Sequence, residues 1–280
     1  MDHMLLGFDG SEASVAALEW VAQRARHVPS HVTLTSVAEL FESERELRRV
    51  SEEGADLLRK LAPSVAVETK VIRGWMPGAL LESEQAADLV VIGSHLYAPV
   101  RSTLKGWVPL RVSVAAAIPS CIVPSGWRER PGPVIVGYDG DGSADAALHF
   151  AASEAARTER KLLIVHAWPI KMLRKRNESA HQEMLEEAVR TVSRAYPGLL
   201  TEHILMADDP ALVLGALARD ASLVVIGSHH HGALAGGLLG TVAWYLVGSM
   251  TSPLCVVPPE FLPPLEMNSD VEPAHTSTTA

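Results

Sequence analysis

The stretch Leu89-Val-Val-Ile-Gly-Ser-His95 decides the fold of this chain, because the same seven residues occur again at 223–229. Two further echoes keep the same order. Leu-Leu-Gly-Phe-Asp-Gly at 5–10 is matched by Ile-Val-Gly-Tyr-Asp-Gly at 135–140, and Pro-Ser-Cys-Ile-Val-Pro at 119–124 by Pro-Leu-Cys-Val-Val-Pro at 253–258. The offset grows from 130 to 134, so the second copy holds four extra residues in its middle. A period this long predicts two copies of one domain, each with its own core, rather than a solenoid.

The length of 280 residues suits two domains of about 130 residues each. We expect the first domain at 1–126, a linker at 127–132, the second domain at 133–258 and a tail at 259–280. Pro131 and Pro133 stop regular structure around the linker. The tail has four prolines, four acidic residues and no Lys or Arg, which predicts disorder.

Composition narrows the class of protein. Hydrophobic residues make up 48% of the chain and aromatic residues only 5%, which is typical of α/β cores built from buried parallel strands. The net charge of −9 argues against non-specific binding to nucleic acid or to an anionic membrane. The two cysteines occupy equivalent positions and are predicted to be buried and reduced, which indicates a cytoplasmic protein. The start of the chain has no basic region typical of a signal peptide.

One apolar segment resembles a membrane-spanning helix in composition. Residues 221–259 contain no Asp, Glu, Lys or Arg, and 232–248 form their most apolar part. That part is short for a span and contains several glycines. Its partner in the first copy carries Arg101, Lys105 and Arg111. A buried α/β core explains both copies, so we expect no membrane-spanning helix.

Each copy alternates apolar runs with segments of helical periodicity. The pattern predicts strands near 4–9, 31–37, 66–73, 88–94 and 120–124, then near 133–139, 161–168, 201–207, 222–228 and 254–258. It predicts helices near 12–27, 43–61, 77–87 and 104–117, then near 143–158, 177–195, 210–219 and 238–250. Such alternation predicts parallel sheets with helices on both faces. Ser14 and Ser43 are the expected N-caps in the first copy, and Asp141 or Ser143 in the second.

The candidate chemistry lies at the carboxyl ends of the strands, where open parallel sheets bind ligands. In the second copy a glycine-rich stretch at 227–241 follows the fourth strand, and its glycines let the backbone approach an anion closely. The step from Gly240 to Thr241 opens a helix, so its amides and the hydroxyl can donate to phosphate oxygens. Asp139, after the first strand, can hold an adenine amine, a ribose hydroxyl or a metal.

With this combination, residues 1–258 resemble the universal stress protein family in its tandem two-domain form. Members that bind ATP carry Gly-x-x-Gly, nine residues, then Gly-Ser or Gly-Thr after strand four, and an Asp after strand one. The resemblance implies an open five-stranded sheet of order 3-2-1-4-5 in each copy, and ATP as the cofactor, with or without Mg²⁺. The site residues that it implies in the second copy are Gly137, Asp139, Ala167, Ile226, Gly227, His230, Gly240, Thr241 and Val242.

Two departures from the family pattern matter. In the second copy His230 stands where the second glycine is expected; His tolerates positive φ better than most residues, and its imidazole can crowd the phosphates or donate to them. In the first copy Leu96 replaces that glycine and Trp107 replaces the Ser or Thr. We therefore expect a nucleotide in the second copy and none in the first.

Metal binding and catalysis are weaker hypotheses. Three adjacent side chains at 229–231 cannot easily converge on one ion, so no metal is predicted. No nucleophile stands in a recognisable order with a base and an acid, so we predict no enzyme, with a slow ATPase or nucleotidyl transferase as an alternative. His166 is interpreted as a pocket-wall residue.

The resemblance also implies partners. The last strands, 120–124 and 254–258, are expected to pair antiparallel within the chain, with Cys121 and Cys255 near that seam, and two chains can form a homodimer. The leading hypothesis is a stress-response regulatory protein that binds ATP or another adenine nucleotide in its second domain. The alternative is an interaction protein that binds no nucleotide and acts through protein contacts.

Overall fold

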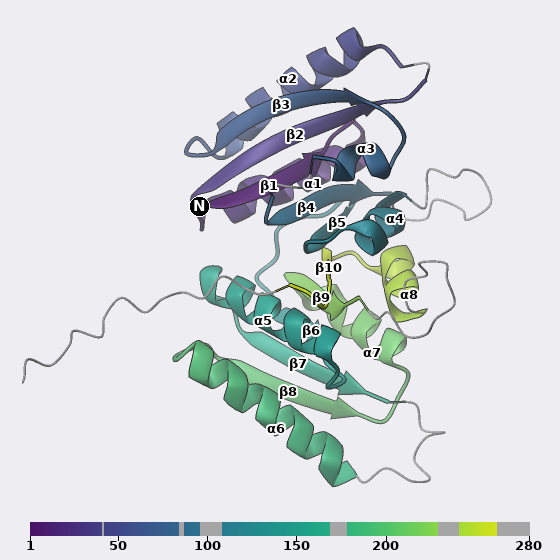
Figure 1. The fold of residues 1–280 in the computed structure, drawn as a ribbon. Helices are drawn as coiled ribbons and strands as arrows, with labels where there is room; N and C mark the ends of the chain where they lie inside the picture. The colour runs from purple at the N-terminus through teal and green to yellow at the C-terminus, as the bar shows by residue number, and fades with distance from the viewer. Residues whose placement is uncertain (41, 84–86, 96–107, 169–177, 229–240, 262–280) are drawn as a thin grey trace, which may run out of the picture.

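The computed structural model describes residues 1–40, 42–83, 87–95, 108–168, 178–228 and 241–261 (Figure 1). The first half contains β1 (Asp2–Gly7), α1 (Glu12–Ala25), β2 (Ser30–Ala38), α2 (Glu44–Leu61), β3 (Ala66–Arg73), α3 (Gly78–Leu81), β4 (Leu89–Ser94), α4 (Val108–Ala115) and β5 (Ser120–Pro124). The second half contains β6 (Val134–Gly137), α5 (Gly142–Arg157), β7 (Leu162–Ala167), α6 (Glu178–Ala195), β8 (Thr201–Met206), α7 (Pro210–Leu217), the 3₁₀ turn η4 (Ala218–Asp220), β9 (Leu223–Gly227), α8 (Thr241–Ser249) and β10 (Leu254–Val257).

All ten strands belong to one sheet of order β3-β2-β1-β4-β5-β10-β9-β6-β7-β8 (Figure 1). Neighbouring strands within each half run parallel, and only the central pair, β5 and β10, is antiparallel among the described strands. Read from its outer edge, each half has the predicted order 3-2-1-4-5. The two five-stranded sheets are joined along their fifth strands, as expected, and form one continuous sheet.

The inner strands are buried on both faces, which explains their apolar runs, whereas the edge strands β3 and β8 are intermediate or exposed along their whole length. Side chains alternate along β1: Met4 and Leu6 join a core under α1 and α2, whereas Leu5 joins a cluster under α3 and α4. The first of these cores is continuous through both halves and also lies under α5 and α6. The opposite face carries a separate cluster in each half.

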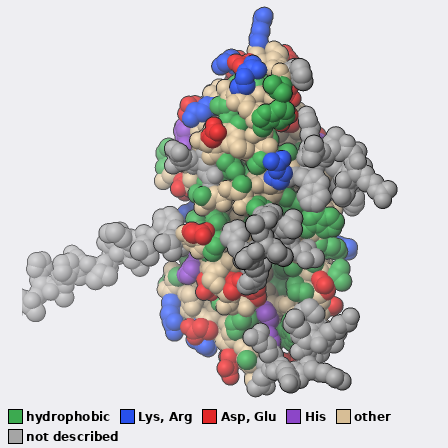
Figure 2. Space-filling view, turned by 45° about the vertical axis from the view of Figure 1, so that its right-hand side comes forward, with side chains coloured by type: hydrophobic (Ala, Val, Ile, Leu, Met, Phe, Trp, Pro, Cys, Tyr) green, Lys and Arg blue, Asp and Glu red, His purple; other side chains and the backbone are tan. Residues whose placement is uncertain are grey.

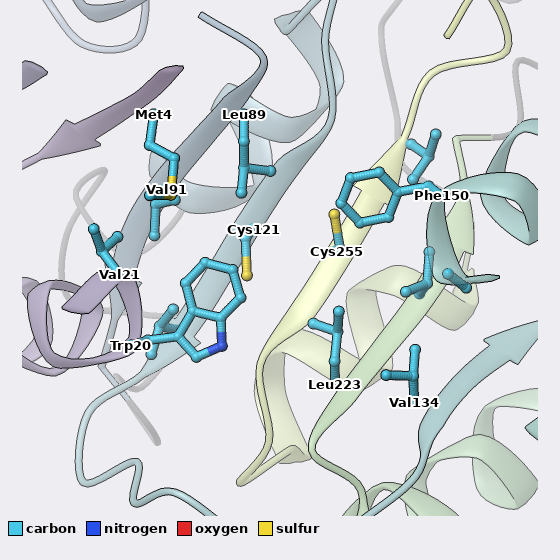
Figure 3. Close-up of a cluster of buried hydrophobic side chains, with 14 of the residues drawn as sticks. Met4, Trp20, Val21, Leu89, Val91, Cys121, Val134, Phe150, Leu223 and Cys255 are labelled. Carbon is cyan, nitrogen blue, oxygen red and sulfur yellow. The ribbon is translucent and has the colours of Figure 1, made fainter. Parts of the chain in front are cut away.

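The seam between the halves is a register of three residue pairs centred on Cys121 opposite Cys255. Both cysteines are free and buried, and Trp20 from α1 and Phe150 from α5 lie on either side of them (Figure 3). Burial raises the pKa of both thiols. The predicted pairing of 120–124 with 254–258 is therefore confirmed, and the protonated, enclosed thiols favour the predicted reduced state.

A buried ion pair crosses this seam. Arg24 of α1 donates to both carboxylate oxygens of Glu154 of α5, at 3.0 and 2.6 Å, and also to Asp2 at 2.8 Å. Arg24 and Glu154 are each only 3% exposed. Burial alone lowers the pKa of Arg24, but the two carboxylates outweigh it and raise that pKa, so the guanidinium stays charged. Arg157 joins the group through Asp2 at 2.7 Å.

The linker is part of this seam as well. Trp127 is 7% exposed and belongs to the shared core. Glu129 pairs with Arg26 at 2.8 Å, and Arg130 donates to the carbonyl of Arg219 at 2.8 Å. Residues 127–132 thus connect the halves without regular structure but pack against both. Residues 262–280, which include most of the predicted tail, lie outside the described residues.

Helix starts differ in detail from the prediction. The N-cap of α1 is Ser11, whose hydroxyl accepts from the amide of Ser14 at 3.2 Å, so the prediction of Ser14 is wrong. Both serines fit the preference, and the geometry of the Asp-Gly turn places the earlier one at the cap. Ser43 caps α2, as predicted. Asp141, rather than Ser143, caps α5.

Two predicted helices of the first half are shorter in the structure. The segment predicted as 77–87 contains one turn, α3, closed by the amides of Glu82 and Ser83; residues 84–86 lie outside the described residues. The segment predicted as 104–117 is α4, and 104–107 are likewise outside. No helix of the described residues is long and apolar enough to cross a membrane. On the face drawn in Figure 2, acidic and basic side chains are interspersed.

We predict that removing one partner of the ion pair between Arg24 and Glu154 lowers the free energy of unfolding far more than removing both. Arg24→Met should lower the free energy of unfolding by about 3 kcal/mol, because it leaves the buried Glu154 without its main cation. Arg24→Met combined with Glu154→Met should recover most of that loss. Urea unfolding of the single and double variants measures the coupling.

The exposed pair supplies the control for this experiment. Arg26 and Glu129 have exposed side chains, so Arg26→Met should change the free energy of unfolding by less than about 1 kcal/mol. Equal losses for Arg24→Met and Arg26→Met would contradict the assignment of the buried pair as the seam's main polar contact.

Candidate functional site

The Asp-Gly turns after β1 and β6 have the same geometry in both halves. Gly140 has φ +80° and Gly10 has φ +77°, a region that side chains other than glycine rarely adopt. In the second half the turn leads into α5, where Asp141 accepts from the amide of Ala144 at 2.8 Å. Asp139 is exposed at the end of β6 and accepts from the amide of Asp141 at 3.4 Å.

The repeated glycines of β4 and β9 have a structural role. A Cβ atom built on Gly227 would lie 2.6 Å from the carbonyl oxygen of Ser143, and one on Gly93 would lie 2.2 Å from that of Ala13. Glycine at these positions lets the strand end lie against the first turn of α5 or α1. The same close packing places both strand ends beside the Asp-Gly turn, so the structural and functional interpretations of these glycines are compatible.

The apolar residues predicted for the site come together. Ile226 is buried, and Ala167 and Val242 pack against the same cluster. Gly137 is next to them, because a Cβ atom there would lie 3.4 Å from Ile226. These four residues come from β6, β7, β9 and α8, and they form one wall beside Asp139.

Three further residues predicted for the site are His230, Gly240 and Thr241. His230 and Gly240 lie outside the described residues. Thr241 is the first residue of α8, as predicted, which places a helix amino terminus next to Val242. The described part of the second half therefore brings the predicted apolar residues together, and the binding of adenine, ribose and phosphate at this place stays a prediction.

His166 does not line this wall. It extends from β7 to the opposite face of the sheet, where Nδ1 lies 2.7 Å from the carbonyl oxygen of Tyr138 and Nε2 lies 2.9 Å from Nδ1 of His181 in α6. The prediction of a pocket-wall residue is wrong, because alternation along β7 places Ala167, its neighbour, on the face of the sheet that carries Ile226, and His166 on the other face. Trp168 stacks on His181 with ring centroids 4.8 Å apart.

When both rings are neutral, these hydrogen bonds fix which nitrogen of His166 and which of His181 carries the hydrogen. A carbonyl can only accept, so Nδ1 of His166 carries a hydrogen and its Nε2 accepts from His181. Burial, followed by the repulsion of His181, lowers the pKa of His166, although the Tyr138 carbonyl and Asp139 oppose the shift. In the first half Ser36 stands at the position of His166, and its hydroxyl lies 2.7 Å from that of Ser51 in α2.

The first half has a cavity at the equivalent place. Its volume is about 420 Å³. The lining includes the counterparts of all the described site residues of the second half except Thr241: Gly7, Asp9, Val37, Ile92, Gly93 and Val108. Leu96 and Trp107, the residues predicted to close this pocket to a nucleotide, lie outside the described residues. That these two residues exclude a nucleotide therefore stays a prediction. The described residues at this place enclose the cavity given above.

Metal ligands do not gather in the described part of the chain, where no group of three or more His, Cys, Asp or Glu could hold an ion. The histidines at 229–231 fall outside that part.

Comparison with known proteins identifies the family. The model of the universal stress protein family matches residues 1–124 and again 132–258. The chain belongs to the universal stress protein family. Its two matches make it a tandem member, with one family domain in each half.

Relatives match this tandem protein along nearly its whole length. A universal stress protein of Mycolicibacterium smegmatis is 27% identical over 285 residues, covering 91% of this chain and 97% of the relative. One of Mycobacterium tuberculosis is 28% identical over 298 residues, covering 90% and 94%. The crystal structure of a universal stress protein from Archaeoglobus fulgidus has a TM-score of 0.71 at 19% identity, covering 92% and 98%, and shows the shared fold.

We predict that the His166–His181 pair makes stability depend on pH. The pKa of His166 is lowered on folding. The contribution of its neutral ring to the stability of the folded protein is therefore complete above the unfolded pKa of about 6.5, and it is lost as the pH falls through the folded pKa. In an NMR titration, the midpoint of the His166 signals should lie below the unfolded value of about 6.5, because burial disfavours its charged form. Below pH 7, the midpoint temperature of thermal unfolding should fall more steeply with pH in the wild type than in the variant that combines His166→Ser with His181→Ser.

That double variant replaces both imidazoles with hydroxyls, which cannot titrate in this range. The comparison uses the slope of stability against pH, because the loss of two rings changes stability at every pH. An unchanged slope, or a His166 that titrates above 6.5, would contradict the prediction.

Proposed function

We propose that this universal stress protein is a cytoplasmic regulatory protein that binds an adenine nucleotide, with ATP as its cofactor, in its second half. Occupancy of the site would change how the glycine-rich loop contacts other proteins, including a second copy of the chain. The protein acts in this proposal by binding, with no catalytic step.

The observation that carries the proposal is the wall formed by Gly137, Ala167, Ile226 and Val242 beside Asp139. An apolar surface suits the adenine ring, and small residues at two of the four positions leave room against it. The exposed carboxylate at the end of β6 can accept from an adenine amine or from a ribose hydroxyl.

The start of α8 supports the placement of the phosphates. Four amides at a helix amino terminus lack partners within the helix, and the helix dipole favours an anion there. α8 has nine residues and begins at Thr241, directly before the wall residue Val242. A nucleotide whose base lies on the wall would extend its phosphates toward this helix, with Mg²⁺ offsetting part of their charge.

Binding of Mg-ATP tests the proposal through stability. Nucleotide at about 100 times its Kd should raise the unfolding midpoint by about 5 °C. Asp139→Ala should reduce this shift, because it removes the polar contact to base or ribose, whereas Asp9→Ala at the equivalent position of the first half should retain it. Nucleotide released from purified, denatured protein gives an independent measurement.

The alternative function is a protein that binds no nucleotide and acts through protein contacts. An empty extract together with no shift in Mg-ATP would favour it. Turnover of ATP that disappears in Asp139→Ala but not in Asp9→Ala would instead favour an ATPase.

The variant His230→Gly separates two roles of that histidine. If His230 only strains the loop, glycine should strengthen nucleotide binding, since it adopts positive φ without cost. If the imidazole donates to a phosphate, the same variant should weaken binding.

A further inference from the structure

The cavity of the first half is lined by a buried hydroxyl and by carboxylates that a nucleotide site does not require. Its volume of about 420 Å³ is in the range of small-molecule sites. One wall is apolar: Leu80 and Ile92 are buried there, and Val37, Met76 and Val108 pack against the same cluster. This wall can cover the body of a small organic ligand.

The floor of the cavity contains a hydroxyl without a partner. Thr35 is 1% exposed, lines the cavity, and its Oγ1 makes no hydrogen bond in the described structure. The position does not require a hydroxyl, because its counterpart in the second half is the buried Val165. Burying a polar group without a partner is unfavourable, so this oxygen is a candidate ligand contact.

The charge of the cavity is one-sided. Asp9, Glu39 and Glu42 line it, and the described lining residues include no Lys or Arg. None of the three makes an ion pair within the described structure. Burial alone would raise the pKa of Asp9, but hydrogen bonds from Ser11 and Ser14 outweigh it and lower that pKa, so the carboxylate is charged at neutral pH.

The acidic rim belongs to the first half alone. The stretch that corresponds to 39–43 in the second half is 169–177, which is four residues longer and contains no Asp or Glu. Three carboxylates repel phosphates and attract a cation. The first half therefore differs from the second in the ligand charge that it favours.

We propose that the first-half cavity binds a small organic cation, a protonated amine carried on an apolar or aromatic body without phosphate. The amine lies among Asp9, Glu39 and Glu42, the body lies on the wall of Leu80 and Ile92, and a polar atom of the ligand meets Thr35. The site is independent of the nucleotide site proposed for the second half.

A matched series of indoles tests the charge preference. Tryptamine, tryptophol and indole-3-acetate share one ring system and carry a positive, a neutral and a negative group. In ligand-observed NMR titrations of the full chain, tryptamine should bind with a Kd of about 1 mM or tighter, as its size allows. Indole-3-acetate should bind at least about tenfold more weakly, with tryptophol between them.

Two variants locate the site. Thr35→Val should weaken tryptamine binding about fivefold or more and leave the unfolding midpoint unchanged or higher, because it removes an unpartnered hydroxyl. Glu39→Gln combined with Glu42→Gln should remove most of the preference for the cation. Asp139→Ala should leave tryptamine binding unchanged, which separates this proposal from the nucleotide site.

Three outcomes would overturn the proposal. These are the absence of tryptamine binding, equal or tighter binding of indole-3-acetate, and full tryptamine affinity in Thr35→Val. Loss of the Mg-ATP effect without any of these would count against the proposed function only.

Discussion

The antiparallel pairing of β5 with β10 is the constraint on which the rest of the molecule depends. Each half, taken alone, would expose the backbone of its fifth strand as a free edge. Joining the two edges converts two sheets into one, and it continues one hydrophobic core under α1 and α5 from half to half. The linker packs against the same seam, so the connection is structural as well as covalent.

The seam also distinguishes the two halves. Arg24 and Glu154 occupy equivalent positions 130 residues apart, and they meet across the pseudo-symmetric interface. Pairing of two first halves would bring two guanidinium groups together, and pairing of two second halves would bring two carboxylates together. Either arrangement leaves buried charge uncompensated, so the ion pair favours the union of unlike halves.

Duplication followed by divergence explains the contrast between the two sites. The backbone at the strand ends is the same in each half, down to the positive φ of Gly10 and Gly140. The side chains around it differ: Ser36 corresponds to His166, and the buried hydroxyl of Thr35 corresponds to Val165. One fold therefore presents two pockets with different charge, which is how a tandem protein can bind two classes of ligand.

The sequence was sufficient to locate the strands, because repeated apolar runs and Asp-Gly turns are local signals that occur twice, whereas the strand order and the seam were expected from the resemblance to the family. It was less informative at helix starts, where Ser11 and Ser14 both satisfy the capping preference and only geometry separates them. The sequence did not predict the contact of Arg24 with Glu154 or that of His166 with His181, because a contact between distant residues has no local pattern. Alternation along β7 was the neglected signal, since it places Ala167 and His166 on opposite faces.

Hydrogen exchange of the full chain, read by mass spectrometry, tests the central role of the seam most directly. If β5 and β10 join the halves into one cooperative unit, the amides of 120–122 and 254–256 should exchange together and in the slowest class, alongside those of β1 and β6. Rapid exchange at the seam while β1 and β6 stay protected would mean that the halves are stable separately, and it would contradict this account.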